Sequence, residues 1–181
     1  LGKILPRALD ISTALIRIYI LLSVLCVLAY MGFGMGPFDA IVHAMTTVST
    51  GGFSSYDTSF ARFQGPQEYV SVEVMLLASL PFIRFFQLVQ GVFRRLWRDP
   101  QVRAYMRWNL YAISLIVGYE LFANANADLS ALVRDTTFNV VTVFSGTGFA
   151  SVDLSTWGPF PFVMLSVVGL IGGCTSSPGC S

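Results

Sequence analysis

The sequence carries the same short glycine-rich run twice, at an interval of 96 residues (148 − 52 = 96). The first run, Ser-Thr-Gly-Gly-Phe, occupies residues 49–53, and the second, Ser-Gly-Thr-Gly-Phe, occupies residues 145–149. The match continues at the same interval on both sides, in the pairs Asp39 and Asp135, Thr46 and Thr142, Asp57 and Asp153, and Ser59 and Ser155. A chain with this internal repeat is expected to fold as two copies of one structural unit.

The composition indicates a membrane protein. Hydrophobic residues make up 54% of the chain and charged residues only 12%, whereas a soluble domain carries about 25% charged residues. The net charge of +1 and the lack of a basic, aromatic-interleaved patch give no indication of nucleic-acid binding. The three cysteines, Cys26, Cys174 and Cys180, form no Cys-x-x-Cys pair, and the single His43 leaves no set of metal ligands. We expect the cysteines to be small apolar fillers.

Four segments approach the roughly 20 apolar residues that a helix needs to cross a bilayer core about 30 Å thick. They are residues 13–33, 69–93, 109–125 and 154–181, and the last is most hydrophobic over residues 160–171. The first three segments carry isolated charged residues, namely Arg17, then Glu73 and Arg84, and then Glu120. The fourth segment carries none.

Each glycine run is preceded by a short apolar helix candidate, at residues 38–48 and 136–144. Asp39 or Asp135 stands near the predicted start, where a carboxylate can cap free N–H groups and favour the positive end of a helix. Both candidates are too short to span a bilayer and suit re-entrant segments. The predicted unit is therefore a spanning helix, a half-helix, a glycine turn and a second spanning helix, found once in residues 1–98 and again in residues 99–181.

The distribution of charge predicts the orientation of these units. Cations gather at the N-terminal end and between the units, as Lys3, Arg7, Arg94, Arg95, Arg98, Arg103 and Arg107. The re-entrant connections carry only Arg62 and Arg134 as cations, against the anions Asp39, Asp57, Glu68, Asp128, Asp135 and Asp153. The positive-inside rule places the arginine-rich linker in the cytoplasm and both glycine turns towards the outer face. The two repeats are therefore expected to be parallel.

Irregular backbone at membrane depth is tolerated where it is buried in protein or lines an aqueous path. Glycine allows successive carbonyls to point in one direction, and such carbonyls, helped by Ser or Thr hydroxyls, can replace the water shell of a monovalent cation. The half-helices would direct their negative ends towards that cation. Phe53 and Phe149 are expected to wedge the turns against neighbouring helices, and Asp57 and Asp153 to cap turn N–H groups. One such turn alone would be an ordinary surface loop, but two in matching surroundings favour an ion path.

The charges inside the spans have several possible roles. Arg84 follows Pro81, a residue that kinks a helix, and either reaches the cytoplasmic edge or faces a gate or a set of carbonyls. Arg17 is expected to reach the inner edge too. Glu120 is expected to contact loop N–H groups or Arg134. With a single histidine there is no nucleophile–base set, so an enzyme is not expected.

Residues 47–54 and 146–153 resemble the filter loops of the Trk/Ktr/HKT potassium transporter superfamily, and most closely those of the bacterial TrkH type. Residues 171–177 resemble the small-residue loop that interrupts the second span of that family's third repeat. The resemblance covers essentially the whole chain. It implies an all-α membrane protein with a pseudo-fourfold pore, of which this chain supplies the second and third of four units, as a piece of a longer protein.

The resemblance also implies a function, namely potassium uptake across the bacterial inner membrane by a multi-pass protein. The implied filter residues are Ser49, Thr50, Gly51, Gly52, Ser145, Gly146, Thr147 and Gly148, with Gly52 and Gly148 matching the filter glycines. The implied gating loop is Gly172, Gly173, Cys174, Thr175, Ser176 and Ser177. Potassium is the transported ion, and no other cofactor is implied. The implied partners are the lipid bilayer, the remaining repeats, a second copy of the subunit and a cytosolic nucleotide-binding regulatory subunit.

One departure and two alternatives remain. Residues 178–181 stand where the family has more glycines followed by a basic residue. A non-conducting membrane module, such as a sensor or assembly subunit with a pore-like fold, is the first alternative. The second is a secondary carrier whose re-entrant turns bind another substrate, although the parallel charge pattern opposes the inverted repeats expected of a carrier.

Overall fold

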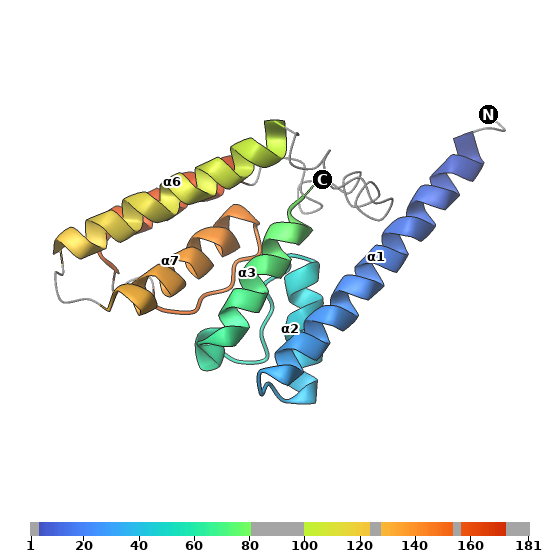
Figure 1. Cartoon of the computed structure of the whole chain (residues 1–181), viewed down its shortest axis with the longest axis horizontal. Coiled ribbons are helices and arrows are strands. Elements are labelled where there is room, and N and C mark those ends of the chain that lie inside the picture. Colours follow the sequence, from blue (N-terminus) through green and yellow to red (C-terminus); the bar gives the residue numbers. More distant parts are fainter. Residues whose placement is uncertain (1–3, 81–99, 124–127, 154–156, 173–181) are drawn as a thin grey trace.

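The computed structural model describes residues 4–80, 100–123, 128–153 and 157–172, and its regular structure in these ranges is helical. The first unit contains α1 (Ile4–Gly32), α2 (Pro37–Val48), a short 3-10 turn (Ala61–Phe63) and α3 (Pro66–Ala78). The second contains α6 (Pro100–Ala123), α7 (Leu129–Phe144) and α8 (Pro159–Gly172). The all-α prediction is confirmed, and both units have the expected order of a longer helix, a shorter helix, a glycine turn and a further helix (Figure 1).

Among the described residues, one helix is long and apolar enough to cross a membrane, namely the stretch Ser12–Gly32 of α1. The apolar part of α8, Pro159–Leu170, is shorter. Of the other two predicted spans, residues 69–93 are described only as far as residue 80. The third corresponds to α6, which begins at Pro100, well before the predicted residue 109.

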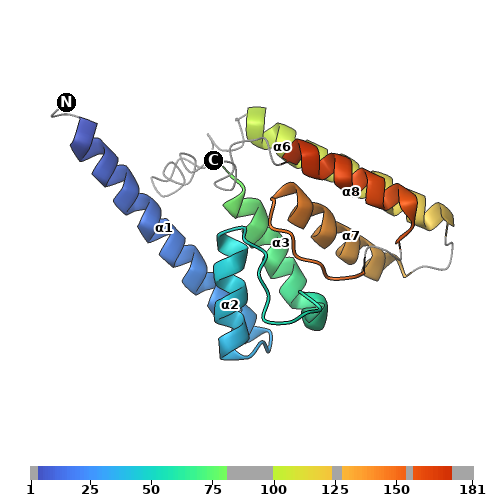
Figure 2. The same ribbon diagram turned by 180° about the vertical axis from the view of Figure 1, so that it is seen from behind.

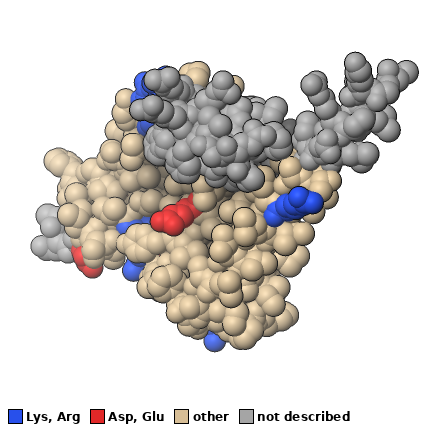
Figure 3. Space-filling model, turned by 45° about the vertical axis from the view of Figure 1, so that its right-hand side comes forward, with Lys and Arg blue, Asp and Glu red and all other residues tan. Residues whose placement is uncertain are grey.

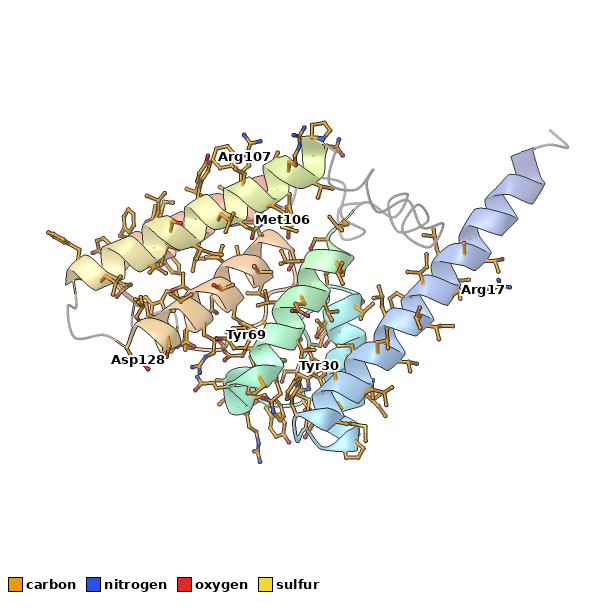
Figure 4. The ribbon with its side chains drawn as sticks, in the orientation of Figure 1. Arg17, Tyr30, Tyr69, Met106, Arg107 and Asp128 are labelled. Atoms are coloured by element: carbon orange, nitrogen blue, oxygen red, sulfur yellow. The ribbon has the colours of Figure 1, made fainter. Side chains whose placement is uncertain are left out.

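The early start of α6 corrects the placement of two arginines. Arg103 and Arg107 were predicted in a loop between the units, but both lie in the first turns of this helix and are exposed. Pro100 suits a first helical position because its fixed φ is helical and its missing N–H would have no partner there. Figure 4 shows Arg107 pointing away from the other helices, on the outer side of α6.

The shorter helix of the first unit agrees closely with the sequence. The segment predicted at residues 38–48 is α2, which starts one residue earlier at Pro37 and has Asp39 in its first turn. In the second unit the prediction was wrong at one end, because α7 starts at Leu129 and not at residue 136. Its N-cap is Asp128, whose carboxylate accepts a hydrogen bond from the backbone N–H of Ser130 at 3.0 Å. Asp135 therefore lies inside the helix and caps nothing at its start.

The helix α7 lies at the centre of the fold. Figures 1 and 2 show it between α3 on one side and the α6–α8 pair on the other. Phe138 and Val141 belong to a buried cluster with residues of α1, α2 and α3, whereas Val140 and Phe144 belong to a cluster with α6 and α8. The first unit and the other two helices of the second unit thus pack on opposite faces of α7.

The described helices cover α2 on one side. Its buried residues Ala40 and Ala44 belong to a cluster with Tyr30 of α1 and Val72 of α3. The side chains of Phe38, Ile41 and Met45 lie one helical turn apart in sequence and are exposed.

Figure 3 shows a face of the molecule that is largely uncharged, as the composition led us to expect.

The long helix α1 contacts the rest of the fold through its C-terminal part. Tyr30 is fully buried, and its hydroxyl bonds Thr47 of α2 at 3.0 Å and Ser71 of α3 at 2.6 Å. Figure 4 shows Tyr30 at this end of α1, beside α2 and α3, and Arg17 pointing outwards further up the helix. Cys26 is also buried, as expected for a small apolar filler. One polar network thus holds the three helices of the first unit together.

Candidate functional site

The two glycine turns begin directly at the ends of α2 and α7 and lie against each other. A Cβ atom built on Gly52 would overlap the backbone carbonyl of Thr147. Gly52 also has a φ of +65°, a conformation that side chains rarely adopt. This position therefore requires glycine for two separate reasons. Gly148 has a φ of +83°, but a Cβ there would meet no atom within 4 Å.

Both turns fold back on their half-helix in the same way. The N–H groups of Gly51 and Gly52 donate to the carbonyl of Thr46, at 2.8 and 3.5 Å. Those of Thr147 and Gly148 donate to the carbonyl of Thr142, at 2.9 and 3.2 Å. These bonds use carbonyls that a helix end otherwise leaves without a partner. The same contacts therefore recur at the interval of 96 residues.

The amide bonds leave the backbone oxygens of the turns available. No described residue donates a hydrogen bond to the carbonyls of Thr50, Gly51 and Gly52, or to those of Gly146, Thr147 and Gly148. Backbone carbonyls are strong acceptors that require a partner when buried. Oxygens of this kind can serve as ligands of a hard monovalent cation.

The hydroxyl groups of the turns are engaged within the turns themselves. Ser49 and Ser145 donate to the carbonyls of Thr46 and Thr142, at 3.5 and 3.1 Å. The hydroxyl of Thr147 bonds that of Ser145 at 2.7 Å, and the hydroxyl of Thr50 donates to the Ser49 carbonyl, also at 2.7 Å. Coordination of a cation by these hydroxyls therefore stays a prediction. The backbone carbonyls are the groups of the turns that are available as ligands.

The two phenylalanines that follow the turns differ. Phe149 is 2% exposed and packs against Phe60, with ring centroids 5.3 Å apart, and against His43 at 6.0 Å. Phe53 is 74% exposed. Phe149 is thus packed in the core, whereas the Phe53 side chain is largely uncovered by the described helices. Their predicted role as wedges for the turns stays a prediction.

A polar side chain on each half-helix holds the chain that leaves the turn. His43 Nδ1 lies 2.8 Å from the carbonyl of Asp39, and Nε2 lies 2.9 Å from the Ser54 hydroxyl. Asn139 donates to the carbonyl of Asp135 at 2.8 Å and to the Ser151 hydroxyl at 3.0 Å. Sequence reasoning missed this pair, although its members are also 96 residues apart (139 − 43 = 96). A polar residue at the same place in two apolar helices was the available signal.

The acidic residues around the turns have different surroundings. Asp39 accepts hydrogen bonds from Ser55 and from the Tyr56 phenol, both at 2.9 Å. This bond to Asp39 raises the pKa of Tyr56. Asp57 and Asp153 are exposed. Their predicted capping role stays a prediction.

Arg134 forms an ion pair that the sequence did not predict. Its Nε lies 2.8 Å from Oε2 of Glu68, and its Nη2 lies 2.9 Å from Oδ1 of Asp135. Glu68 is fully buried. The suggested contact between Arg134 and Glu120 is wrong, because the guanidinium is turned to these two other carboxylates.

Several predicted site residues fall outside the described ranges. Arg84 does so, as do residues 173–177 of the predicted gating loop. Gly172 is the last residue of α8. The gating role and the role of Arg84 therefore stay predictions.

Comparison with known families places this helical fold, with its two glycine turns at the ends of two half-helices, in one class. The model of the family described as "TrkH: Cation transport protein" matches residues 1–180. The chain belongs to the TrkH family.

Known relatives agree with this assignment. The chain is 36% identical to the Trk system potassium uptake protein TrkI of Halomonas elongata, over 97% of this chain and 36% of that protein. It is 33% identical to the Trk system potassium uptake protein TrkH of Escherichia coli K12, over 98% of this chain and 37% of that protein. The crystal structure of the potassium transporter TrkH from Vibrio parahaemolyticus superimposes with a TM-score of 0.84 at 25% identity, covering 96% of this chain and 37% of that one. The chain thus spans little more than a third of the length of these relatives.

Proposed function

We propose that the chain forms two sides of a potassium-selective pore, through which the complete protein takes up potassium across the bacterial inner membrane. The contact between the two turns carries this proposal. Gly52 approaches the Thr147 carbonyl so closely that no side chain fits between them, and six neighbouring carbonyls accept no hydrogen bond from the described residues. Two such turns placed side by side are suited to give oxygen ligands to one ion.

The helix ends support the same function. The turns follow directly on the C-terminal ends of α2 and α7, which carry roughly half a negative charge each. These ends favour a cation over an anion beside the turns. Potassium is proposed as the ion because the named relatives are potassium uptake proteins.

The rest of the pore and its control belong to the complete protein. Two turns cannot enclose an ion on four sides, so the other two filter turns are proposed to come from repeats outside this chain. Residues 172–177 are proposed as the gate beneath the filter. A second copy of the subunit and a cytosolic nucleotide-binding regulatory subunit are proposed as partners, on the strength of the family resemblance.

The test is a flux measurement on the complete protein in liposomes, with potassium and sodium compared for Gly52→Ser and Gly148→Ser. We expect both changes to lower the preference for potassium, because a side chain at positive φ costs about 1–3 kcal/mol and moves the carbonyls. Gly52→Ser should act more strongly, since its Cβ also overlaps the Thr147 carbonyl. Gly118→Ser in α6 is the matched control, because a Cβ there meets nothing within 4 Å.

An unchanged preference in both filter variants would contradict the filter assignment. A complete protein that passes no potassium at all, with or without its partners, would favour the non-conducting membrane module. Potassium transport that saturates and is coupled to a second substrate would favour the carrier.

A further inference from the structure

A buried ion pair joins the first unit to the second. Glu68 lies in the first turn of α3 and is fully buried, while Arg134 lies in α7 with its side chain 23% exposed. Oε2 of Glu68 lies 2.8 Å from Arg134 Nε in this ion pair and accepts a hydrogen bond from the backbone N–H of Gly65 at 2.9 Å. Its other oxygen, Oε1, is buried and has no partner among the described residues. A buried carboxylate needs a counter-charge, so Arg134 is held in place by Glu68.

The segment that follows the second glycine turn is also held by the first unit. The N–H of Phe60 donates to the Ala150 carbonyl at 3.0 Å, and the N–H of Ala150 donates to the Ser59 hydroxyl at 3.1 Å. The Gln64 side chain donates to the Ser151 carbonyl at 2.9 Å. The backbone immediately after Gly148 is therefore positioned by residues of the other unit.

These contacts close into a ring. The ion pair connects the start of α3 to α7, the bond from Asn139 to the Ser151 hydroxyl connects α7 to the segment after the turn, and Gln64 connects that segment back to the chain just before α3. Figure 4 shows Tyr69, the neighbour of Glu68, where α3 meets α7. Of the three links, only the Glu68–Arg134 link is ionic, and its guanidinium fork has a fixed direction.

We propose that Glu68 and Arg134 are positioning residues for cation specificity, because their ion pair fixes the second filter turn against the first. Neither residue is placed against the ion. They act through α7, which carries the Thr142 carbonyl that orients Thr147 and Gly148. Discrimination between potassium and sodium depends on how carbonyl oxygens are arranged around the ion, so a shift of one turn against the other weakens it. The inference rests on the proposed pore function.

The experiment compares potassium and sodium flux through the complete protein in liposomes for Glu68→Gln, Arg134→Gln and the double variant. We expect each single change to lower the potassium-to-sodium ratio about fivefold, and the double variant to lower it no further, as residues in one interaction do. Glu73→Gln removes an exposed carboxylate of the same helix. This control should keep the wild-type ratio.

Two further variants keep the inference testable if Glu68→Gln does not fold. Arg134→Lys keeps the charge but loses the fork that reaches Glu68 and Asp135 together, and Gln64→Ala opens the ring at another link. Both should lower the ratio while potassium flux and the melting temperature stay measurable.

Wild-type ratios in Arg134→Lys, Gln64→Ala and any folded Glu68 variant would overturn the inference, as would an equal loss of ratio in Glu73→Gln. These outcomes are distinct from a failure of the pore function. If the wild-type protein itself does not prefer potassium, the proposed function fails; if it does and the variants match it, only the positioning role fails.

Discussion

The half-helices α2 and α7 end alike but lie in different surroundings. In both, the carbonyl of a threonine, Thr46 or Thr142, accepts the N–H groups of the residues five and six positions further on. The helix α7 is covered by α3 on one side and by α6 and α8 on the other, whereas α2 leaves Phe38 and Ile41 exposed. Because the same turn geometry occurs in two environments, the turn is determined locally, by threonine and glycine. Its position is determined by the elements that pack around the helix.

The largest expected effect concerns the two phenylalanines after the turns, which differ in burial. Phe149→Ala is expected to lower the free energy of unfolding by about 3–5 kcal/mol, because it opens a cavity in the aromatic cluster. Phe53→Ala is expected to cost well under half as much, since Phe53 is 74% exposed. Thermal unfolding of the complete protein in detergent measures both. An equal loss in Phe53→Ala would show that another part of the complete protein buries this side chain.

The sequence predicted the turns better than it predicted their surroundings. The bounds of α2 were right within one residue, because Pro37 marks its start and the glycines mark its end. The predicted start of α7 was wrong because Asp128 and Asp135 both suit an N-cap. Only the hydrogen bond that the Ser130 N–H donates to the Asp128 carboxylate decides between them. The pair of Glu68 and Arg134 was not predictable, since nothing local brings α3 to α7.

A middle-sized effect is expected where His43 and Asn139 hold the segments after the turns. Asn139→Ala breaks two hydrogen bonds of a fully buried side chain and should cost about 1–3 kcal/mol, because it leaves buried groups unsatisfied. His43→Ala should cost at least as much, since it also removes a ring that packs on Phe60 and Phe149.

The equivalence of the two positions can be tested by exchange. His43→Asn places in α2 the residue that α7 carries, and it should retain part of the stability that His43→Ala loses, because the amide can still donate to the Asp39 carbonyl. The melting temperatures of the wild type, His43→Asn and His43→Ala test this equivalence. If His43→Asn melts no higher than His43→Ala, the two side chains do not share one role.

The smallest effect concerns the two aspartates at matching positions, which have different partners. Asp135 is paired with Arg134, whereas Asp39 accepts from Ser55 and from the Tyr56 phenol. Tyr56→Phe should lower the free energy of unfolding less than either change above, because it removes a single hydrogen bond of a partly exposed side chain. The bond to Asp39 raises the pKa of Tyr56, while Arg62, whose Cζ lies 4.6 Å from the ring centroid, acts in the opposite direction.

The sign of the pH dependence follows from this raised pKa. The folded protein holds the phenol proton more tightly than the unfolded chain, whose tyrosines titrate near pH 10. The stability contributed by the bond is therefore complete below about pH 10 and is lost as the pH rises through the folded value. Urea unfolding of wild type and Tyr56→Phe at pH 8 and above pH 10 should show a difference that shrinks with rising pH. A constant difference would mean that the phenol stabilises the α2 turn by packing and not through Asp39.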